Sequence, residues 1–105
     1  MNKAVQNKSE LIAQLHQHSR RISGYGVQRL GIFGSFAKDC ANDSSDVDFF
    51  IEFIPGKKTF DNFMELAFCL EEITGRKIEL VTRQSLNKYI GKYILQEIEY
   101  VPIAA

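Results

Sequence analysis

The segment LGIFGSFAKDCANDSSDVDFFIEF, residues 30–53, decides the fold. It holds two apolar runs that are separated by a Gly34-Ser35 turn and a polar loop, with Asp46 and Asp48 at the start of the second run. Side chains of a strand alternate between its two faces, so the two carboxylates are predicted to project from one face. The apolar residues between and after them are predicted to face a core: Val47, Phe49, Ile51 and Phe53.

The paired carboxylates indicate a bound cation. Two like charges at adjacent positions on one face repel each other and contribute nothing to a core. Hard divalent cations such as Mg²⁺ prefer oxygen ligands, so the pair predicts a Mg²⁺ site. Five acids and no base lie between Asp39 and Glu52, in a chain whose formal net charge is zero. For Asp39 and Asp43, a solvated acidic loop is an equally good interpretation.

The Gly34-Ser35 turn indicates a phosphate site. A strand that ends in Gly-Ser and turns into a helix presents free backbone N–H groups, which attract anions. Gly34 lets the backbone approach a ligand closely because it has no Cβ. Ser35 can donate its hydroxyl, and Lys38 adds positive charge one turn later. A phosphate cradle beside a pair of metal-binding carboxylates is what phosphoryl or nucleotidyl transfer needs.

The composition is that of an ordinary globular domain, with 45% apolar and 25% charged residues in a chain of 105. The zero net charge argues against bulk attraction to nucleic acid or to a membrane, and no direct nucleic-acid contact is expected. No apolar run is long enough for a signal peptide or a membrane span, which predicts a cytoplasmic protein. Cys40 and Cys69 form no metal or redox motif and are predicted to be free thiols.

The remaining pattern alternates helices with strands. Helices are predicted from about Lys8 to Ile22 and after a Thr59 cap as far as Gly75, and Ser85 is the predicted cap of a last helix. Short strands are predicted at 30–33, 46–53 and 78–81, with a strand or coil at 99–103. This alternation implies an α/β layer with a small mixed sheet.

Two predictions concern the apolar surface of the helices and strands. The buried stripe of the helix after Thr59 is predicted to consist of Phe60, Phe63, Met64, Ala67 and Leu70. Phe50 and Phe68 lie off the expected core faces, so they are predicted to form an interface with a partner or with a second copy of the chain.

The Gly34-Ser35 turn followed by Asp46-Val47-Asp48 resembles the signature of the DNA polymerase beta-like nucleotidyltransferase superfamily. The short chain and the order of its elements resemble the minimal nucleotidyltransferases, the antitoxins that are paired with HEPN-domain toxins. The similarity runs from Val27 to Val101. It implies a nucleotidyltransferase fold, an α/β (α+β) arrangement of a small mixed sheet flanked by helices, with residues 1–105 forming one minimal domain.

The resemblance also implies roles for individual residues. Asp46 and Asp48 would hold Mg²⁺ bound to a triphosphate, for which ATP is the expected substrate. Gly34 and Ser35, with Lys38, would bind the outer phosphates. A third acid on the next strand, matched here by Glu79, would be a further metal ligand or the base that activates an acceptor hydroxyl, often of a Tyr on the partner toxin.

The chain departs from the family pattern at two places. Glu79 replaces the usual Asp and is one methylene longer, and Mg²⁺ tolerates misplaced ligands poorly. Lys38-Asp39 stands where the minimal family commonly has Arg-Gly. Lys38 keeps the charge but loses the bidentate fork of Arg, and Asp39 is expected to put a negative charge near the phosphates.

Three functions therefore stay open. The first is a protein adenylyltransferase that acts as an antitoxin. The second is a catalytically weakened subunit that neutralises the toxin by contact. The third is nucleotidyl transfer to a small molecule such as an aminoglycoside, which a chain of this length leaves little room to bind. A homo-oligomer is compatible with each.

Overall fold

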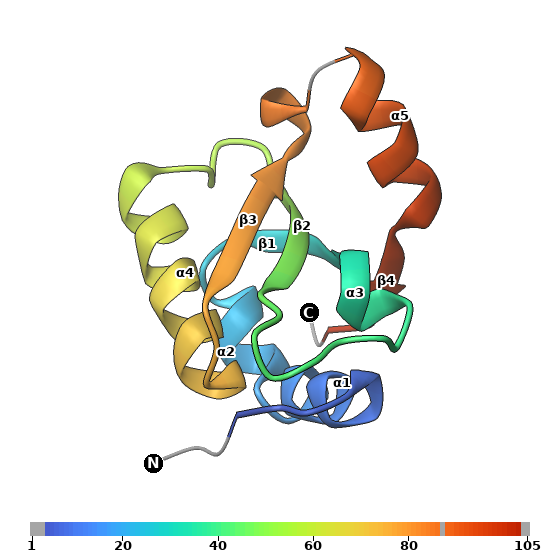
Figure 1. Cartoon of the computed structure of the whole chain (residues 1–105). Helices are drawn as coiled ribbons and strands as arrows, with labels where there is room; N and C mark the ends of the chain where they lie inside the picture. Colours follow the sequence, from blue (N-terminus) through green and yellow to red (C-terminus); the bar gives the residue numbers. More distant parts are fainter. Residues whose placement is uncertain (1–3, 87, 104–105) are drawn as a thin grey trace.

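Residues 4–86 and 88–103 are described in a computed structural model, without the side chains of 88–90. The helices are α1 (Lys8–Gln17), α2 (Ser19–Ser23), α3 (Gly34–Ala37), α4 (Phe60–Thr74) and α5 (Lys88–Glu97) (Figure 1). The strands are β1 (Val27–Phe33), β2 (Val47–Phe53), β3 (Ile78–Thr82) and β4 (Glu99–Val101), and a 3₁₀ turn spans Arg83–Ser85.

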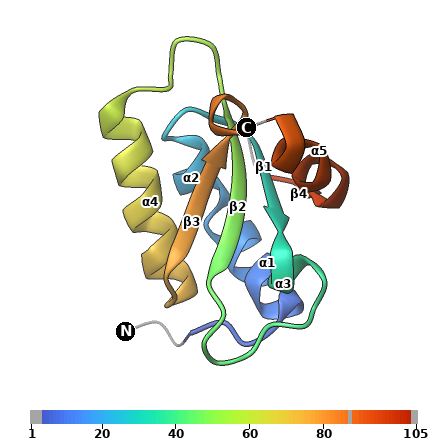
Figure 2. The same cartoon turned by 45° about the horizontal axis from the view of Figure 1, so that its top comes forward.

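The strands form one mixed sheet in the order β3-β2-β1-β4. Strand β1 is antiparallel to both β2 and β4, and β2 is parallel to β3. Helices α1, α2 and α4 lie together behind the sheet, and α5 stands apart from them on the side of the β1–β4 pair (Figures 1 and 2). The prediction of a small mixed sheet flanked by helices is confirmed, and one face of the sheet is left partly open.

The alternation predicted for β2 is confirmed. Val47, Phe49 and Ile51 belong to the buried core, and Phe53 packs against it. Leu30 and Ile32 of β1 join the same core. Helices α1, α2 and α4 supply the facing layer through Leu11, Leu15, Ile22, Leu66, Cys69, Leu70 and Ile73. Asp48 therefore points to the open face.

The first helix is interrupted, which corrects the prediction of one helix from Lys8 to Ile22. Its N-terminus is as expected, since the Asn7 side chain accepts a hydrogen bond from the Glu10 backbone N–H at 2.9 Å. At His18 the backbone leaves the helical region, with φ −106° and ψ 19°. The break has a packing reason, because α1 contacts α3 and α4 whereas α2 contacts β1.

Helix α4 begins and ends as predicted, but of its predicted buried stripe only Leu70 is fully buried. Thr59 caps it by accepting a hydrogen bond from Asn62 N–H at 3.1 Å, and Gly75 ends it with φ +67°. Phe60 is 79% exposed, and Phe63, Met64 and Ala67 are only partly buried. The fully buried apolar residues are Leu66, Cys69, Leu70 and Ile73. This helix carries more apolar residues than one face can bury, and contact with the sheet selects the stripe.

Phe50 is fully buried, so its predicted exposure was wrong, whereas Phe68 is 56% exposed. Phe50 lies on the open face in register with Gly31 of β1. Ile98, which follows α5, lies so close to Gly31 that a Cβ there would collide with it. The chain after α5 therefore closes over this part of the sheet, which the local pattern around Phe50 does not reveal.

The C-terminal region differs from its prediction at the helix start. Ser85 belongs to the 3₁₀ turn, where its hydroxyl accepts a hydrogen bond from Thr82 N–H at 2.9 Å, and α5 begins at Lys88. Residues 99–101 form strand β4. Cys40 and Cys69 are free, as predicted. Within the described residues, no helix is both long and apolar enough to cross a membrane.

Candidate active site

Three acids meet on the open face of the sheet. The parallel register of β2 and β3 sets Asp48 opposite Glu79, and Asp46 lies one residue before β2 begins. The pKa of Asp48 is raised to about 6, first by burial and then by the charges of Glu79 and Asp46 and a hydrogen bond with Glu79. The structure thus brings together the three acids that the sequence singled out.

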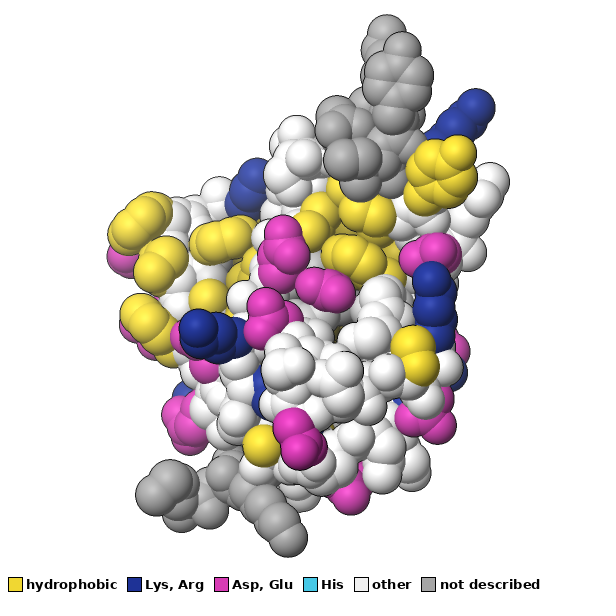
Figure 3. All heavy atoms as spheres, viewed as in Figure 1, with side chains coloured by type: hydrophobic (Ala, Val, Ile, Leu, Met, Phe, Trp, Pro, Cys, Tyr) yellow, Lys and Arg dark blue, Asp and Glu magenta, His cyan; other side chains and the backbone are white. Residues whose placement is uncertain are grey.

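The open face is acidic at its centre. Asp and Glu side chains gather there, with hydrophobic side chains beside them (Figure 3). Asp48 is partly buried, whereas Asp46 and Glu79 are exposed. A carboxyl whose pKa is raised by neighbouring carboxylates sits in an excess of negative charge, which a bound cation would relieve.

Gly34 lies directly against Asp48. Its φ is +73°, a left-handed conformation that favours glycine, and a Cβ at this position would collide with the Asp48 carboxylate. Glycine is therefore required here for both conformation and space. The close approach places the Gly34-Ser35 turn, the candidate phosphate site, beside the candidate metal ligands.

The donor set suits Mg²⁺ by its chemistry, since it consists of carboxylate oxygens. Among residues 4–86 and 88–103, no three His, Cys, Asp or Glu side chains are already arranged as a set that could hold a metal ion. The interactions of Asp48 with Asp46 and Glu79 nevertheless show that the three are neighbours. Both of these partners, Asp46 and Glu79, are exposed.

Lys38 and Asp39 make contacts with other helices. The Lys38 ammonium pairs with Glu97 of α5 at 3.3 Å. The Asp39 carboxylate accepts a hydrogen bond from the Lys8 backbone N–H at 3.1 Å, at the start of α1. Asp39 also has φ +54°, which explains why glycine suits this position. Its carboxylate thus binds the N-terminus of α1.

Asp39 supplies a direct test of this structural role. Asp39→Ala loses the hydrogen bond and keeps the positive φ, so it is expected to cost about 1–2 kcal/mol of unfolding free energy. Asp39→Gly also loses the bond but relieves the strain, so its stability should stay within about 0.5 kcal/mol of wild type. Urea unfolding measures the stability of both variants. Equal losses of unfolding free energy in Asp39→Ala and Asp39→Gly would contradict this prediction.

Two further features were not anticipated from the sequence. Arg76, between α4 and β3, donates hydrogen bonds to several backbone carbonyls of the loop before Asp46. A cleft of about 460 Å³ is lined by Asp46, Arg76, Lys77 and the end of that loop. Nothing in the local pattern distinguishes Arg76 from any other Arg beside a helix-ending glycine.

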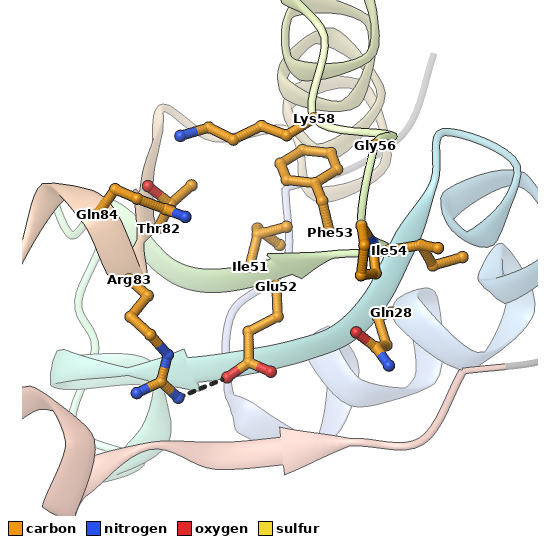
Figure 4. A pocket seen from close by; sticks show the side chains of 11 residues that line it. Gln28, Ile51, Glu52, Phe53, Ile54, Gly56, Lys58, Thr82, Arg83 and Gln84 are labelled. Carbon is orange, nitrogen blue, oxygen red and sulfur yellow. Dashed lines mark hydrogen bonds and ion pairs between the residues drawn. The ribbon is translucent and has the colours of Figure 1, made fainter.

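A second pocket lies at the other end of β2. It has a volume of about 290 Å³ and includes Glu52, Lys58 and Arg83 (Figure 4). Arg83 pairs with Glu52 at 3.0 Å, and Arg29 also binds Glu52 at 3.0 Å. Hydrogen bonds from Arg29 and then from Arg83 lower the pKa of Glu52. The Glu52 carboxylate is thus paired with arginines, unlike the acids around Asp48.

The fold and the acids beside a glycine turn define a nucleotidyltransferase. A family model described as "Nucleotidyltransferase domain" matches residues 12–101, and the chain belongs to that family. Its α/β fold matches that of a solved structure of a protein provisionally described as a minimal nucleotidyltransferase. That structure has a TM-score of 0.80 and 24% identity, covering 92% of this chain and 98% of the other.

Curated relatives are similar over nearly their whole length. Protein adenylyltransferase MntA of Thermococcus cleftensis is 34% identical over 101 residues, which are 93% of this chain and 99% of the relative. A protein of Methanocaldococcus jannaschii, provisionally named a protein adenylyltransferase, is 33% identical over 96 residues, 89% of this chain and 96% of its own. A solved toxin–antitoxin structure with AMP-PNP shares the fold, with a TM-score of 0.60 and 20% identity. The match covers 93% of this chain and 74% of the other.

Proposed function

We propose that this chain is a Mg²⁺-dependent protein adenylyltransferase. It transfers AMP from ATP to the hydroxyl group of a Tyr on a HEPN-type toxin and thereby acts as the antitoxin of that toxin. The observation that carries the proposal is the half-buried Asp48, with its pKa raised beside Asp46 and Glu79 and with Gly34 against its carboxylate. The names of the curated relatives support protein as the acceptor. Such a reaction belongs in the cytoplasm, where ATP and the partner are present.

Each residue has a definite task in this proposal. Asp46 and Asp48 would hold Mg²⁺, with Glu79 as a third ligand or as the base. When bound, the ion would neutralise the triphosphate and polarise its α-phosphorus. The turn at Gly34 admits the phosphates, and Ser35 donates hydrogen bonds to them. An acceptor oxygen attacks the α-phosphorus in line, its proton passes to a carboxylate such as Glu79, and the bond to pyrophosphate breaks.

The test uses the protein with Mg²⁺, ATP and the purified product of a neighbouring toxin gene. The expected result is a gain of one or more AMP masses on the toxin, located by mass spectrometry on a Tyr. Asp46→Asn should abolish the gain, because it removes a ligand charge without changing the size of the side chain. Glu65→Gln, an exposed acid on α4, is the matched control and should keep full transfer.

Neutralisation separates the alternatives. An unmodified toxin that is nonetheless fully neutralised by the Asp46→Asn protein would overturn catalysis and favour inhibition by contact. AMP found on an aminoglycoside and never on the toxin would favour a small-molecule acceptor instead. Measuring toxin activity, toxin mass and aminoglycoside mass in the same reactions distinguishes the three outcomes.

A further inference from the structure

Arg76 lies between α4 and β3, and its guanidinium is surrounded by carbonyl oxygens. Its Nε donates to Val5 O at 2.6 Å, and its Nη1 donates to Asn42 O and Ser45 O, both at 2.9 Å. A longer contact of 3.4 Å joins Nη1 to Asp43 O. The guanidinium also lies over the Phe36 ring at 5.0 Å. A single side chain thus holds three separate segments together.

Two of these segments, the loop before Asp46 and helix α3, carry parts of the candidate site. The carbonyl of Ser45 belongs to the residue directly before Asp46. Phe36 is fully buried in α3, two residues after Gly34. Arg76 itself lies three residues before Glu79, and Lys77 O accepts a hydrogen bond from Val47 N–H at 3.0 Å. The acids and the turn are therefore joined through contacts that converge on Arg76.

The charge of Arg76 does not explain this arrangement. Its guanidinium donates four hydrogen bonds within the described residues, all to backbone carbonyls rather than to a carboxylate. A positive charge lining the same cleft as Asp46 opposes the binding of a cation there. The planar fork, in contrast, is suited to hold several acceptors at once in a fixed geometry.

We propose that Arg76 is a positioning residue of the metal–nucleotide site, and that it acts by fixing the loop that presents Asp46 to the cation. The inference rests on the proposed function, because it assumes that Asp46 is a metal ligand. Partners that orient a metal ligand typically account for about 10–100-fold in metal affinity. Here Arg76 acts through the backbone of the loop that carries the proposed metal ligand Asp46.

The test measures Mn²⁺ affinity directly, by the electron paramagnetic resonance signal of free Mn²⁺ at fixed ionic strength. Arg76→Gln is expected to weaken binding by about tenfold or more, because the loop loses its clamp. A purely electrostatic role predicts the opposite sign, since removing a positive charge beside the acids would tighten binding. Arg76→Lys keeps the charge but loses the fork, and is also expected to weaken binding.

Arg29→Gln is the matched control. Arg29 donates to both carboxylate oxygens of Glu52 at 3.0 Å and lies over the Tyr100 ring at 4.1 Å, so its guanidinium is also held by several contacts, at the far end of β2. Its loss should leave Mn²⁺ affinity within about twofold of wild type, because its charge is paired and screened. Circular dichroism melts verify that each variant is folded, and Arg76→Lys serves alone if Arg76→Gln does not fold.

The outcomes separate this inference from the function on which it rests. A wild-type chain that binds no Mn²⁺, or one whose affinity is unchanged by Asp46→Asn, overturns the metal site itself. If Asp46→Asn weakens Mn²⁺ binding but neither Arg76 variant does, only the role of Arg76 is overturned. The proposal also requires the Mg²⁺ concentration for half-maximal transfer to rise in Arg76→Lys, with activity recovering at saturating Mg²⁺.

Discussion

Replacing Asp48 by Asn is expected to abolish nucleotidyl transfer and, without metal, to make the folded chain more stable at neutral pH. Transfer is lost because the amide is a poor ligand for Mg²⁺. Stability rises because folding moves the Asp48 carboxyl next to Glu79 and Asp46 and partly removes it from water. The function of the site thus opposes the stability of the fold.

The pH dependence of this effect has a definite sign. The folded-state pKa of Asp48 is about 6, above the ordinary value of 3.8 that applies to the unfolded chain. The folded state therefore binds the extra proton, and the destabilisation is absent below pH 3.8 and complete above pH 6. The full shift corresponds to about 3 kcal/mol, which solvent screening of a half-exposed group reduces to about 1 kcal/mol.

Urea unfolding in the presence of a chelator measures the gap between wild type and Asp48→Asn. We expect the variant to be more stable by about 1 kcal/mol at pH 7.5 and the gap to close toward pH 4. Added Mg²⁺ should stabilise wild type alone, because only that chain has the complete set of ligands. Glu65→Gln should show no such pH-dependent gap, and a less stable Asp48→Asn protein at pH 7.5 would refute the argument.

Gly34→Ala is expected to have the second large effect, a loss of transfer of about a hundredfold or more together with lower stability. The positive φ of residue 34 costs an L-residue about 1–2 kcal/mol. In addition, the new Cβ collides with the Asp48 carboxylate and must displace it. A displacement of about 1 Å at a catalytic group can cost about a hundredfold in rate.

Gly56→Ala is a close control for the first of these terms. Gly56 has φ +84°, but a Cβ there would meet nothing within 4 Å. Gly56→Ala should therefore have the same conformational cost and keep its activity. The difference in activity and stability between the two variants then measures the effect of the collision with Asp48. The same transfer assay and urea unfolding serve for both variants. Equal transfer activity in the two proteins would contradict the prediction, because it would show that the collision does not displace Asp48 from its working position.

The local features of the candidate site could be predicted from the sequence. Asp46 and Asp48 flank a residue that faces the core, so the two-residue period of a strand places both on the other face. Gly34 was predicted to allow a close approach because it has no Cβ, and in the structure a Cβ there would collide with Asp48. The caps at Asn7 and Thr59 are equally local. Backbone geometry alone determines these features, and a few neighbouring residues specify it.

The stripe of α4, the burial of Phe50 and the direction of Asp39 could not be obtained in this way. Each depends on an element that is distant in the sequence: the sheet for α4, the chain after α5 for Phe50, and the start of α1 for Asp39. Periodicity shows that a helix has an apolar side, but not which of two overlapping stripes its neighbour will cover.

By itself, the sequence determined the motif, the alternation of β2 and the chemistry that paired carboxylates beside a glycine turn can perform. Only the tertiary structure decided that Glu79 lies opposite Asp48 in register and that Arg76 holds the loop before Asp46. The physical reason is the range of the interactions. Alternation and turns follow from the covalent chain, whereas registers and side-chain clamps exist only after distant segments have packed together.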